Sequence, residues 1–489
     1  MVYVVDAIMG SGKTTAAINY INSHFGEKIM YVTPYVDEAK RIQQNCERRG
    51  FAVPSEIASV QHNGKPTKYS DLVRLVEDGR NIATTHSLYK RCDPPLLAKI
   101  KEQGYTLIID ENIDCLETNE RLRNGDIYNS DTIMENSKDV MDLCQLGYLV
   151  KVKEYTRGES RYIVFDKNPE KPYGSTGCHA NLFKRISARG ITVCLDKDDL
   201  DPEERIFEQV FWSLRPEVLS SFRNVFIMTY LFEYQGLYYL IKANNIEYKT
   251  IGIIKENEEL NFNFGDQSRN HIPEWTKHLD SLIDILDNKA LNAIGEKRCA
   301  LSINWFTKNT DGCVEVARKN LKNLFTNYFK DSAGDKKGGG KRARNKSRLW
   351  GSCKKGQEML KGNGYASSFL PFNARATNEY KEAYHLAYMA NIFINKKVAT
   401  IYKNMGIVVN EEQYALSTMI QWIWRSAIRD GKPIRIYIPS KRMRELLIKW
   451  IEDLKNGGTG RCVTAKTVGG SGRTSATKKR EVKTAATNQ

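Results

Sequence analysis

The N-terminal residues 2–25 constrain the fold of this chain more than any other segment. The apolar, β-branched run VYVVDAI (2–8) predicts a strand, and TTAAINYINSHF (14–25) has the residue spacing of a helix. Between them, Gly10 and Gly12 allow the backbone to turn its N–H groups toward an anion, and the helix adds its positive N-terminal end. A strand, a glycine-rich loop and a helix in this order predict an α/β fold with a phosphate-binding site.

The spacing of the loop from Ala7 to Thr14 fits the phosphate-loop pattern of proteins that bind nucleoside triphosphates, with Ala7 in the place of the first glycine. The Lys13 ammonium group can reach the β- and γ-phosphates, and the Thr14 hydroxyl can bind Mg²⁺. The alternative is a glycine–serine turn that happens to precede a lysine, and the predicted strand and helix on either side argue against it. The predicted nucleotide-binding residues are Met9, Gly10, Ser11, Gly12, Lys13, Thr14 and Thr15.

Strand and helix patterns alternate from the N-terminus to residue 112. Short apolar strands are predicted at 28–34, 80–86 and 105–111, and the helical stretches between them end in glycine. This alternation is typical of a doubly wound α/β domain with a parallel sheet. From about residue 115 to 215 the alternation stops, and YLVKVKEY and RYIVF predict a hairpin, so we interpret this segment as an α+β insertion.

The alternation resumes after the insertion. Further apolar strands are predicted at 224–232, 246–254, 299–306, 397–403 and 434–440. We therefore expect two parallel-sheet domains in tandem, at 1–245 (with the insertion) and 246–453, followed by a disordered, basic tail at 454–489. The basic stretch 334–348 holds seven Lys or Arg residues and one Asp, and is either a solvated loop or an electrostatic contact to a nucleic-acid backbone.

Two acids close the predicted strand LIIDEN. Asp110 and Glu111 follow an apolar run, which places carboxylates beside the glycine-rich loop. In nucleotide sites of this kind, the Asp orders the Mg²⁺ shell and the Glu polarises the attacking water. The predicted Mg²⁺ ligands are Thr14 and Asp110, and the alternative is a strand end without a chemical role.

A polar stripe is predicted on the helix EEQYALSTMIQWIWRSAIRDG (411–431). Gln421, Arg425 and Arg429 recur at four-residue spacing, so they share one helix face. One interpretation is an amphipathic helix with surface arginines. The other is an arginine finger, a guanidinium group from the second domain that neutralises charge on the γ-phosphate.

Charge and composition narrow the class of protein. The net charge of +16 and the pI near 9.2 indicate a polyanionic partner, most simply nucleic acid. No run of 18 or more apolar residues and no cationic, apolar leader occurs in the sequence, so we expect neither a membrane-spanning nor a secreted protein. The ten Cys are scattered, which favours reduced thiols in a cytoplasmic protein over disulfides or a zinc site.

Several of these motifs, in this order, resemble those of superfamily 2 helicases, of the compact DEAD/DEAH-like type found in large tailed phages. AIMGSGKTT resembles motif I, VTPYVDEAKRI resembles motif Ia, and IATTHSL looks like the following strand motif. DEN stands where DEAD or DEAH would be, and MTYLFE where SAT or TAT would be. FLPFNARATNEYKEA is similar to motif V, and QWIWRSAIRDG to motif VI. The resemblance covers roughly residues 1–115 and 216–453.

The resemblance implies two RecA-like domains with ATP between them and a nucleic-acid track across both. Single-strand phosphate contacts are then expected at Thr33, Pro34, Thr85, His86, Ala376, Thr377 and Asn378. Hydroxyl, amide and backbone donors suit a track that grips phosphates without reading bases. Thr85 and His86 could instead be capping residues at a strand end. Arg425 is favoured as the finger because its distance from Gln421 matches the family motif, whereas Arg429 is shifted by one residue.

The sequence thus predicts an ATP- and Mg²⁺-dependent helicase or translocase that acts on nucleic acid, with single-stranded DNA favoured and RNA open, in the cytoplasm (of the host, if the chain is phage-encoded). One alternative is a nucleic-acid-stimulated ATPase that remodels or clamps nucleic acid without unwinding it. A nucleotide kinase or a packaging-motor ATPase are further alternatives, and the two-domain length and motif VI argue against the kinase.

Overall fold

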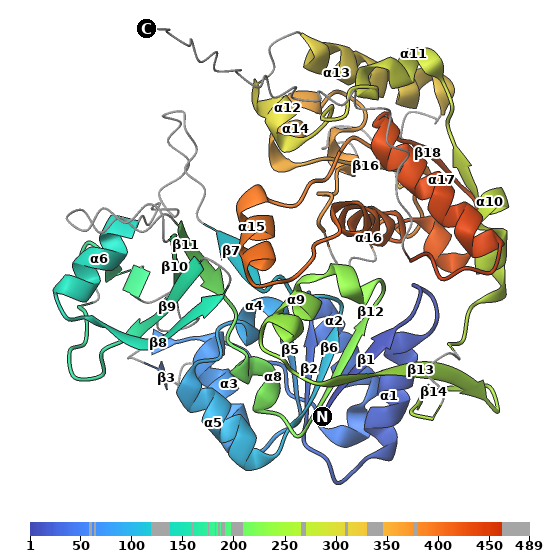
Figure 1. Cartoon of the computed structure of the whole chain (residues 1–489). Coiled ribbons are helices and arrows are strands. Elements are labelled where there is room, and N and C mark those ends of the chain that lie inside the picture. The colour runs from blue at the N-terminus through green and yellow to red at the C-terminus, as the bar shows by residue number, and fades with distance from the viewer. Residues whose placement is uncertain are drawn as a thin grey trace, which may run out of the picture.

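The computed structural model describes residues 1–57, 61–62, 65–118, 137–157, 160–174, 176–180, 182–183, 186, 191–196, 209–265, 270–308, 312–329, 346–374 and 379–461. The chain forms an N-terminal domain around a parallel sheet, an antiparallel sheet on one side of it, and a C-terminal domain around a second parallel sheet (Figure 1). The predicted α/β class is therefore confirmed.

The N-terminal sheet has seven strands. Its order is β14 (Glu259–Asn263), β13 (Tyr248–Glu256), β1 (Val2–Asp6), β12 (Asn224–Thr229), β6 (Thr106–Asp110), β2 (Ile29–Thr33) and β5 (Ile82–Thr85). All neighbours are parallel except the β13–β14 hairpin. The predicted strands at 28–34, 80–86, 105–111 and 224–232 are confirmed. Because the parallel strands point the same way, Asp6 and Asp110, the last residues of β1 and β6, lie along the same side of the sheet, where the strands have their carboxyl ends.

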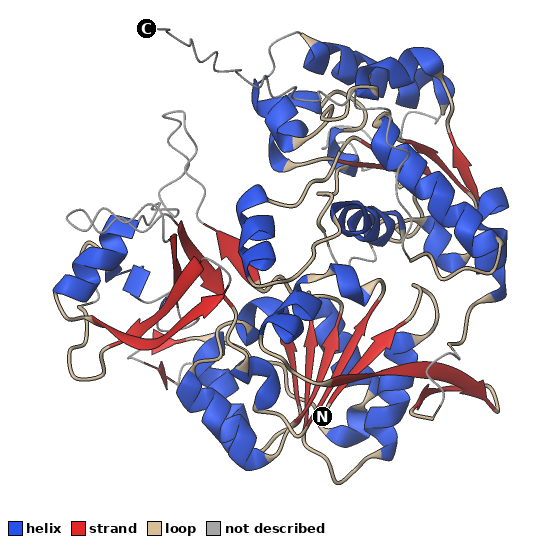
Figure 2. Cartoon of the chain, viewed as in Figure 1, coloured by secondary structure: helices blue, strands red, loops and turns tan. Residues whose placement is uncertain are grey.

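Helices cover both faces of this sheet (Figure 2). They are α1 (Lys13–Ser23), α2 (Val36–Asn45), α3 (Lys68–Glu77), α4 (His86–Tyr89), α5 (Pro94–Gln103), α8 (Glu217–Ser220) and α9 (Gly236–Ala243). Local sequence sets their ends: the Asp93 carboxylate accepts from the Leu96 N–H at the start of α5, where two prolines follow, and Gly104 ends that helix in the left-handed conformation. A two-stranded ribbon, β3 (Gln61–His62) and β4 (Lys65–Pro66), lies near α3.

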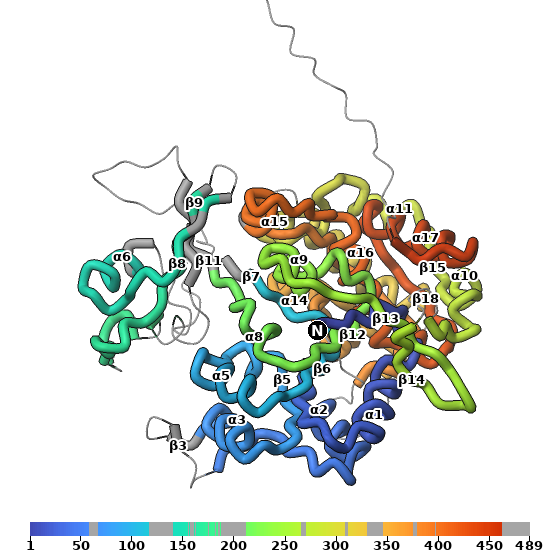
Figure 3. The backbone as a smooth tube through the Cα atoms, turned by 60° about the horizontal axis from the view of Figure 1, so that its bottom comes forward, coloured from blue at the N-terminus to red at the C-terminus, as the bar shows by residue number. Residues whose placement is uncertain are grey.

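Residues between β6 and β12 form the five-stranded antiparallel sheet. Its order is β7 (Leu116–Thr118), β11 (Gln209–Ser213), β10 (Ile191–Asp196), β9 (Ser160–Lys167) and β8 (Leu149–Arg157), with α6 (Ser137–Gln145) packed against β8. The predicted hairpin is confirmed as β8–β9. Figure 3 shows this sheet standing to one side of the two parallel-sheet domains.

The C-terminal domain contains a four-stranded parallel sheet. Its order is β15 (Ile283–Ile285), β18 (Ile434–Tyr437), β17 (His385–Tyr388) and β16 (Arg348–Gly351). Its helices are α10 (Leu279–Leu282), α11 (Lys289–Asn292), α12 (Ile303–Lys308), α13 (Cys313–Asn323), α14 (Lys354–Leu360), α15 (Lys396–Asn404), α16 (Glu411–Ile423) and α17 (Lys441–Lys455). The predicted strand at 434–440 is confirmed as β18.

In the second half, two strand predictions and the predicted start of the second domain need correction. The strand at 246–254 exists as β13, but it pairs with β1, so residue 246 is too early a start for the second domain. The stretch 299–306 is a turn followed by α12, and 397–403 lies in α15. In α15 the apolar Val398, Ile401 and Tyr402 recur at helical spacing and form one inward face, a pattern that a short apolar run does not distinguish from a strand.

The predicted disorder from residue 454 is wrong for its first residues. Helix α17 extends to Lys455, and the segment Thr459–Arg461 packs on the N-terminal domain, where the Tyr230 hydroxyl donates to the Thr459 carbonyl at 3.0 Å. Gly460 fits because a Cβ there would lie 2.4 Å from both Trp450 Nε1 and the Tyr230 hydroxyl. Residues 462–489 lie outside the described part of the chain, as do residues 334–345 of the basic stretch 334–348.

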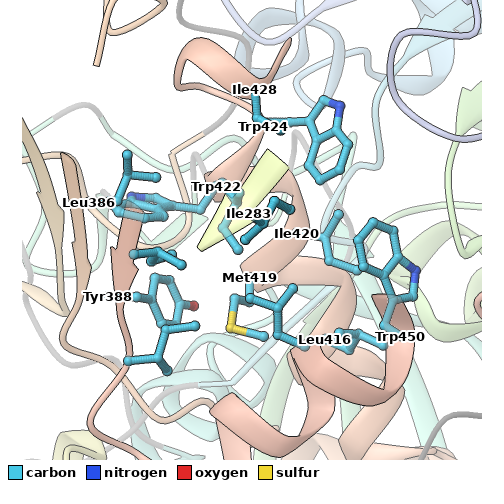
Figure 4. Close-up of a cluster of buried hydrophobic side chains, with 14 of the residues drawn as sticks. Ile283, Leu386, Tyr388, Leu416, Met419, Ile420, Trp422, Trp424, Ile428 and Trp450 are labelled. Carbon is cyan, nitrogen blue, oxygen red and sulfur yellow. The ribbon is translucent and has the colours of Figure 1, made fainter. Parts of the chain in front are cut away.

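An apolar cluster joins the two parallel-sheet domains. Figure 4 shows its centre, where Trp422, Trp424 and Trp450 pack around α16 and α17. The same cluster includes Ile8 of the glycine-rich loop and Tyr230 after β12, both from the N-terminal domain. Burial of each such side chain stabilises by about 1.5–3 kcal/mol relative to exposure, so the domains are held closed at the edge where the glycine-rich loop lies.

Candidate functional site

The glycine-rich loop between β1 and α1 depends on two glycines. Gly10 and Gly12 have φ angles of 85° and 86°, in the left-handed region that favours glycine. Side chains from later in the sequence also press on the loop: a Cβ on Gly12 would lie 2.3 Å from Leu260 Cδ1, and one on Gly10 would lie 3.1 Å from Trp275 Cζ2. The loop therefore has little room for any other residue at these two positions.

Lys13 folds back over this loop. Its Nζ donates to the carbonyls of Ala7 (2.5 Å) and Ile8 (3.0 Å). Burial lowers the pKa of Lys13 to about 8, although the nearby carboxylates of Asp110 and Asp6 act in the opposite direction. A cation held by two carbonyls of its own loop can exchange them for the oxygens of an arriving anion.

Asp110, at the end of β6, faces the start of α1. Its Oδ2 accepts from the Tyr31 hydroxyl at 2.9 Å and from the Thr14 hydroxyl at 3.5 Å. Burial, together with the charge of Glu111, raises the pKa of Asp110 to about 6, against the opposing effects of Tyr31 and Lys13.

The oxygens of Thr14 and Asp110 fit a magnesium ion. Mg²⁺ prefers hard oxygen ligands and is usually held by one or two protein groups together with phosphate oxygens and waters. Within the described residues, no group of three or more His, Cys, Asp or Glu side chains could hold a metal by itself. Two protein oxygens beside the glycine-rich loop fit a metal whose other ligands come from phosphate and water.

Glu111 connects the two parallel-sheet domains. Its φ angle of 66° is unusual for a residue with a side chain, and its N–H donates to the Met228 carbonyl at 3.0 Å. The Glu111 carboxylate pairs with the Arg425 guanidinium, with 2.5 Å between Oε1 and Nη2. The two side chains are 22% and 8% exposed, so this ion pair is largely shielded from water.

The predicted polar stripe on one helix is wrong. Helix α16 ends at Ile423, and the chain turns at Trp424 before a 3₁₀ turn from Ala427 to Asp430. Gln421 is on the helix, Arg425 lies in the turn directly after Trp424, and Arg429 lies in the 3₁₀ segment. The apolar residues 422–424 and 427–428 around this helix end are all buried, so packing in the core, and not one continuous helix face, places the two arginines.

Arg429 lies in a different electrostatic setting from Arg425. Burial lowers the pKa of Arg429, and the charge of Arg425 acts in the same direction, whereas Glu38 on α2 raises it. Arg425 contacts the predicted base Glu111, while the acid with the largest effect on the pKa of Arg429 is Glu38, on α2.

For two of the predicted nucleic-acid contacts in the N-terminal domain, Thr85 and His86, the structure shows a partner within the protein. Thr33 is fully buried, and Pro34 after it is half-buried. The Thr85 hydroxyl accepts from the Leu88 N–H and caps α4. His86 is buried, with Nε2 2.8 Å from the Asp110 carbonyl oxygen. The capping alternative thus holds for Thr85, and Ala376, Thr377 and Asn378 lie outside the described residues.

Three residues that the sequence did not single out shape the site. The buried carboxylate of Asp6 accepts from the N–H groups of Leu231 (2.8 Å) and Phe232 (3.3 Å). It also pairs with Arg461 at 2.7 Å, which ties the segment after α17 to the strand before the glycine-rich loop. Trp275, in the linker between the domains, stacks on Trp424 with ring centroids 6.2 Å apart.

Asn112, which follows the two acids, has a structural role. Its Oδ1 accepts from the Leu237 N–H at 3.1 Å and so satisfies the first turn of α9. No local signal marks Asp6, Arg461 or Trp275 as site residues, because their partners lie more than 120 positions away in the chain.

The fold and the site define an α/β protein of two parallel-sheet domains, in which a glycine-rich loop on the first faces an arginine-bearing turn on the second. The chain belongs to the YonV family. It is 31% identical over 455 residues to the SPbeta prophage-derived uncharacterized protein YonV of Bacillus subtilis (strain 168), an alignment that spans 92% of this chain and 99% of that protein. Residues 277–451 match the family model described as the YonV C-terminal Rossmann-like domain.

Two solved structures are similar to this chain over most of its length. The structure of S. tokodaii Xpd4 covers 91% of this chain and 93% of its own, with a TM-score of 0.41 and 12% identity. A structure titled XPD_Helicase covers 94% of this chain and 95% of its own chain, with a TM-score of 0.35 and 10% identity. In the part of the chain that the structure describes, no helix is both long enough and apolar enough to cross a membrane.

Proposed function

We propose that this chain is an ATP-dependent helicase or translocase, in which two RecA-like domains couple ATP hydrolysis to movement on nucleic acid. The observation that carries the proposal is the ion pair between Glu111 and Arg425. It joins the predicted base of one domain to the predicted finger of the other, at the edge where the glycine-rich loop lies.

Each side chain then has a role in hydrolysis of the terminal phosphate. Lys13 exchanges the carbonyls of Ala7 and Ile8 for phosphate oxygens. Glu111 accepts a proton from the attacking water, and Arg425 stabilises the charge that develops on the γ-phosphate. Mg²⁺, held through Thr14 and Asp110, would neutralise phosphate charge when it is bound.

The Glu111–Arg425 pair also predicts that hydrolysis is slow at rest. While Arg425 holds the Glu111 carboxylate, Oε1 of that carboxylate is occupied by the guanidinium, and the guanidinium is not directed at phosphate. A ligand that spans both domains can shift Arg425 from Glu111 to the nucleotide, which is how nucleic acid would stimulate turnover. The net charge of +16 supports a nucleic-acid partner, with single-stranded DNA favoured and RNA possible.

The second candidate is an ATPase that clamps or remodels nucleic acid without unwinding it. The burial of Thr33 and His86 favours it, because two residues expected to line a translocation track do not face solvent.

ATP turnover, measured without nucleic acid and with saturating single-stranded DNA or RNA, tests the proposal. We expect stimulation by at least one of the two, and the absence of hydrolysis under all three conditions would refute the ATPase. Strand displacement on a tailed duplex then separates the helicase from the clamp.

A further inference from the structure

Tyr31 is a polar residue inside an apolar strand, and neither the sequence motifs nor the proposed roles account for it. It lies in the middle of β2, opposite Ile108 of β6, and is fully buried. A tyrosine in such a position needs a partner for its hydroxyl. That partner is Asp110 Oδ2, at 2.9 Å.

The geometry at Asp110 divides the carboxylate into two unequal oxygens. Both hydroxyl donors, from Tyr31 and from Thr14, approach the same oxygen, Oδ2. Tyr31 comes from the strand beside β6, and Thr14 comes from α1, so they hold the carboxylate from two sides. The Thr14 hydroxyl donates a hydrogen bond to Asp110, which leaves the lone pairs of its oxygen for a metal.

We propose that Tyr31 is a positioning residue for magnesium: its hydroxyl fixes the Asp110 carboxylate so that the other oxygen, together with Thr14, meets the hydrated Mg²⁺ of a bound nucleotide. This role rests on the proposed function. Groups that orient a metal ligand typically contribute 10–100-fold to metal affinity or activity, because a free carboxylate must lose rotational freedom each time the metal binds.

The competing account is that Tyr31 is an ordinary core residue whose hydroxyl happens to find an acceptor. In that case, removal of the hydroxyl changes stability but leaves the Mg²⁺ requirement as it was. Tyr20, on α1, offers a matched control in the same domain. Its hydroxyl donates to the Glu27 carboxylate at 3.2 Å and not to Asp110.

The experiment measures binding of a fluorescent ATP analogue to the full chain as Mg²⁺ is varied, and again in EDTA. For Tyr31→Phe we expect the Mg²⁺ concentration at half-maximal binding to rise about tenfold or more, with binding in EDTA unchanged. Tyr20→Phe is expected to match the wild type in both conditions. A Tyr31→Phe titration that overlays the wild type overturns the proposal.

A second pair of variants shows whether Tyr31 acts through Asp110. In an Asp110→Asn background, Tyr31→Phe should add no further shift to the Mg²⁺ titration, and an undiminished additional shift would contradict the proposed route. The outcomes also separate the two proposals. A wild-type chain that binds no nucleotide refutes the function itself, whereas Mg²⁺-dependent binding that Tyr31→Phe leaves unaltered refutes only the role of Tyr31.

Discussion

The two domains contribute to the candidate site in different ways. In the N-terminal domain, the site is built from short segments at the ends of two parallel strands of one sheet: the glycine-rich loop after β1 and the acids at the end of β6. In the C-terminal domain, it consists of Arg425 in a turn after α16 and Arg461 in a segment after α17. The first half is thus fixed by local sequence, and the second half depends on how the domains pack.

This difference predicts that changes in the C-terminal half affect catalysis more than nucleotide binding. Arg425→Ala should lower nucleic-acid-stimulated turnover by about 10³–10⁵-fold, the range for loss of an arginine finger, while ATP affinity changes far less. Steady-state kinetics with saturating single strands measure both quantities. A fall in affinity with turnover preserved would assign Arg425 to binding instead.

A change in the charge of Lys13, in the N-terminal half of the site, should alter nucleotide binding itself. Lys13 has a pKa of about 8 in the free protein, so it is charged below that pH and loses its proton above it. Since phosphate favours the charged form, ADP affinity should fall about fivefold from pH 8 to pH 9.

The control for this pH dependence is Lys13→Arg, whose guanidinium stays charged throughout this range and should show a flat profile. Parallel declines in the wild type and in Lys13→Arg would contradict the assignment of the titration to Lys13.

The smallest effect is expected at the contact between Arg461 and Asp6. Arg461→Ala leaves a buried carboxylate with only its backbone donors, but the arginine side chain is 38% exposed and partly screened. We expect a loss of about 1 kcal/mol, seen as a fall of a few degrees in melting temperature.

The matched change for Arg461→Ala is Lys455→Ala, which breaks an exposed pair with Asp280 and should leave the melting temperature nearly unchanged. Equal effects from the two substitutions would show that the Asp6 contact has no special importance.

The comparison of the two halves also explains which features the sequence could predict. The strands at 28–34 and 105–111 were predictable because each apolar run is short and follows a helix that ends in glycine, the two signs that favour a strand over a buried helix. Helix α15 was mistaken for a strand because the group that it packs on lies far away in the sequence. Its inward face contacts Tyr239 of the N-terminal domain and not the sheet of the C-terminal domain. Periodicity alone does not reveal such a partner.

In the candidate site, too, local motifs could be predicted from the sequence, and contacts between distant residues could not. Gly10, Lys13 and Asp110 belong to short motifs whose chemistry can be inferred from spacing. Tyr31 and Asp6 could not be found in this way, since a single polar residue in an apolar strand acquires a role only from the groups that folding brings to it. The helix expected to carry Arg425 ends at Ile423, and Arg425 reaches Glu111 from the turn that follows, a position that helical spacing does not predict.

The central claim is that Glu111 and Arg425, from different domains, act in one catalytic site. The most direct test is ATP turnover, with saturating nucleic acid, of Glu111→Gln, Arg425→Ala and the double variant. Glu111→Gln alone should lose about 10²–10⁴-fold, the range for a general base. Residues that act as a unit give non-additive losses, so the account predicts that the double variant is about as slow as the slower single variant. A double variant whose loss equals the product of the two single losses would show independent sites and contradict the account.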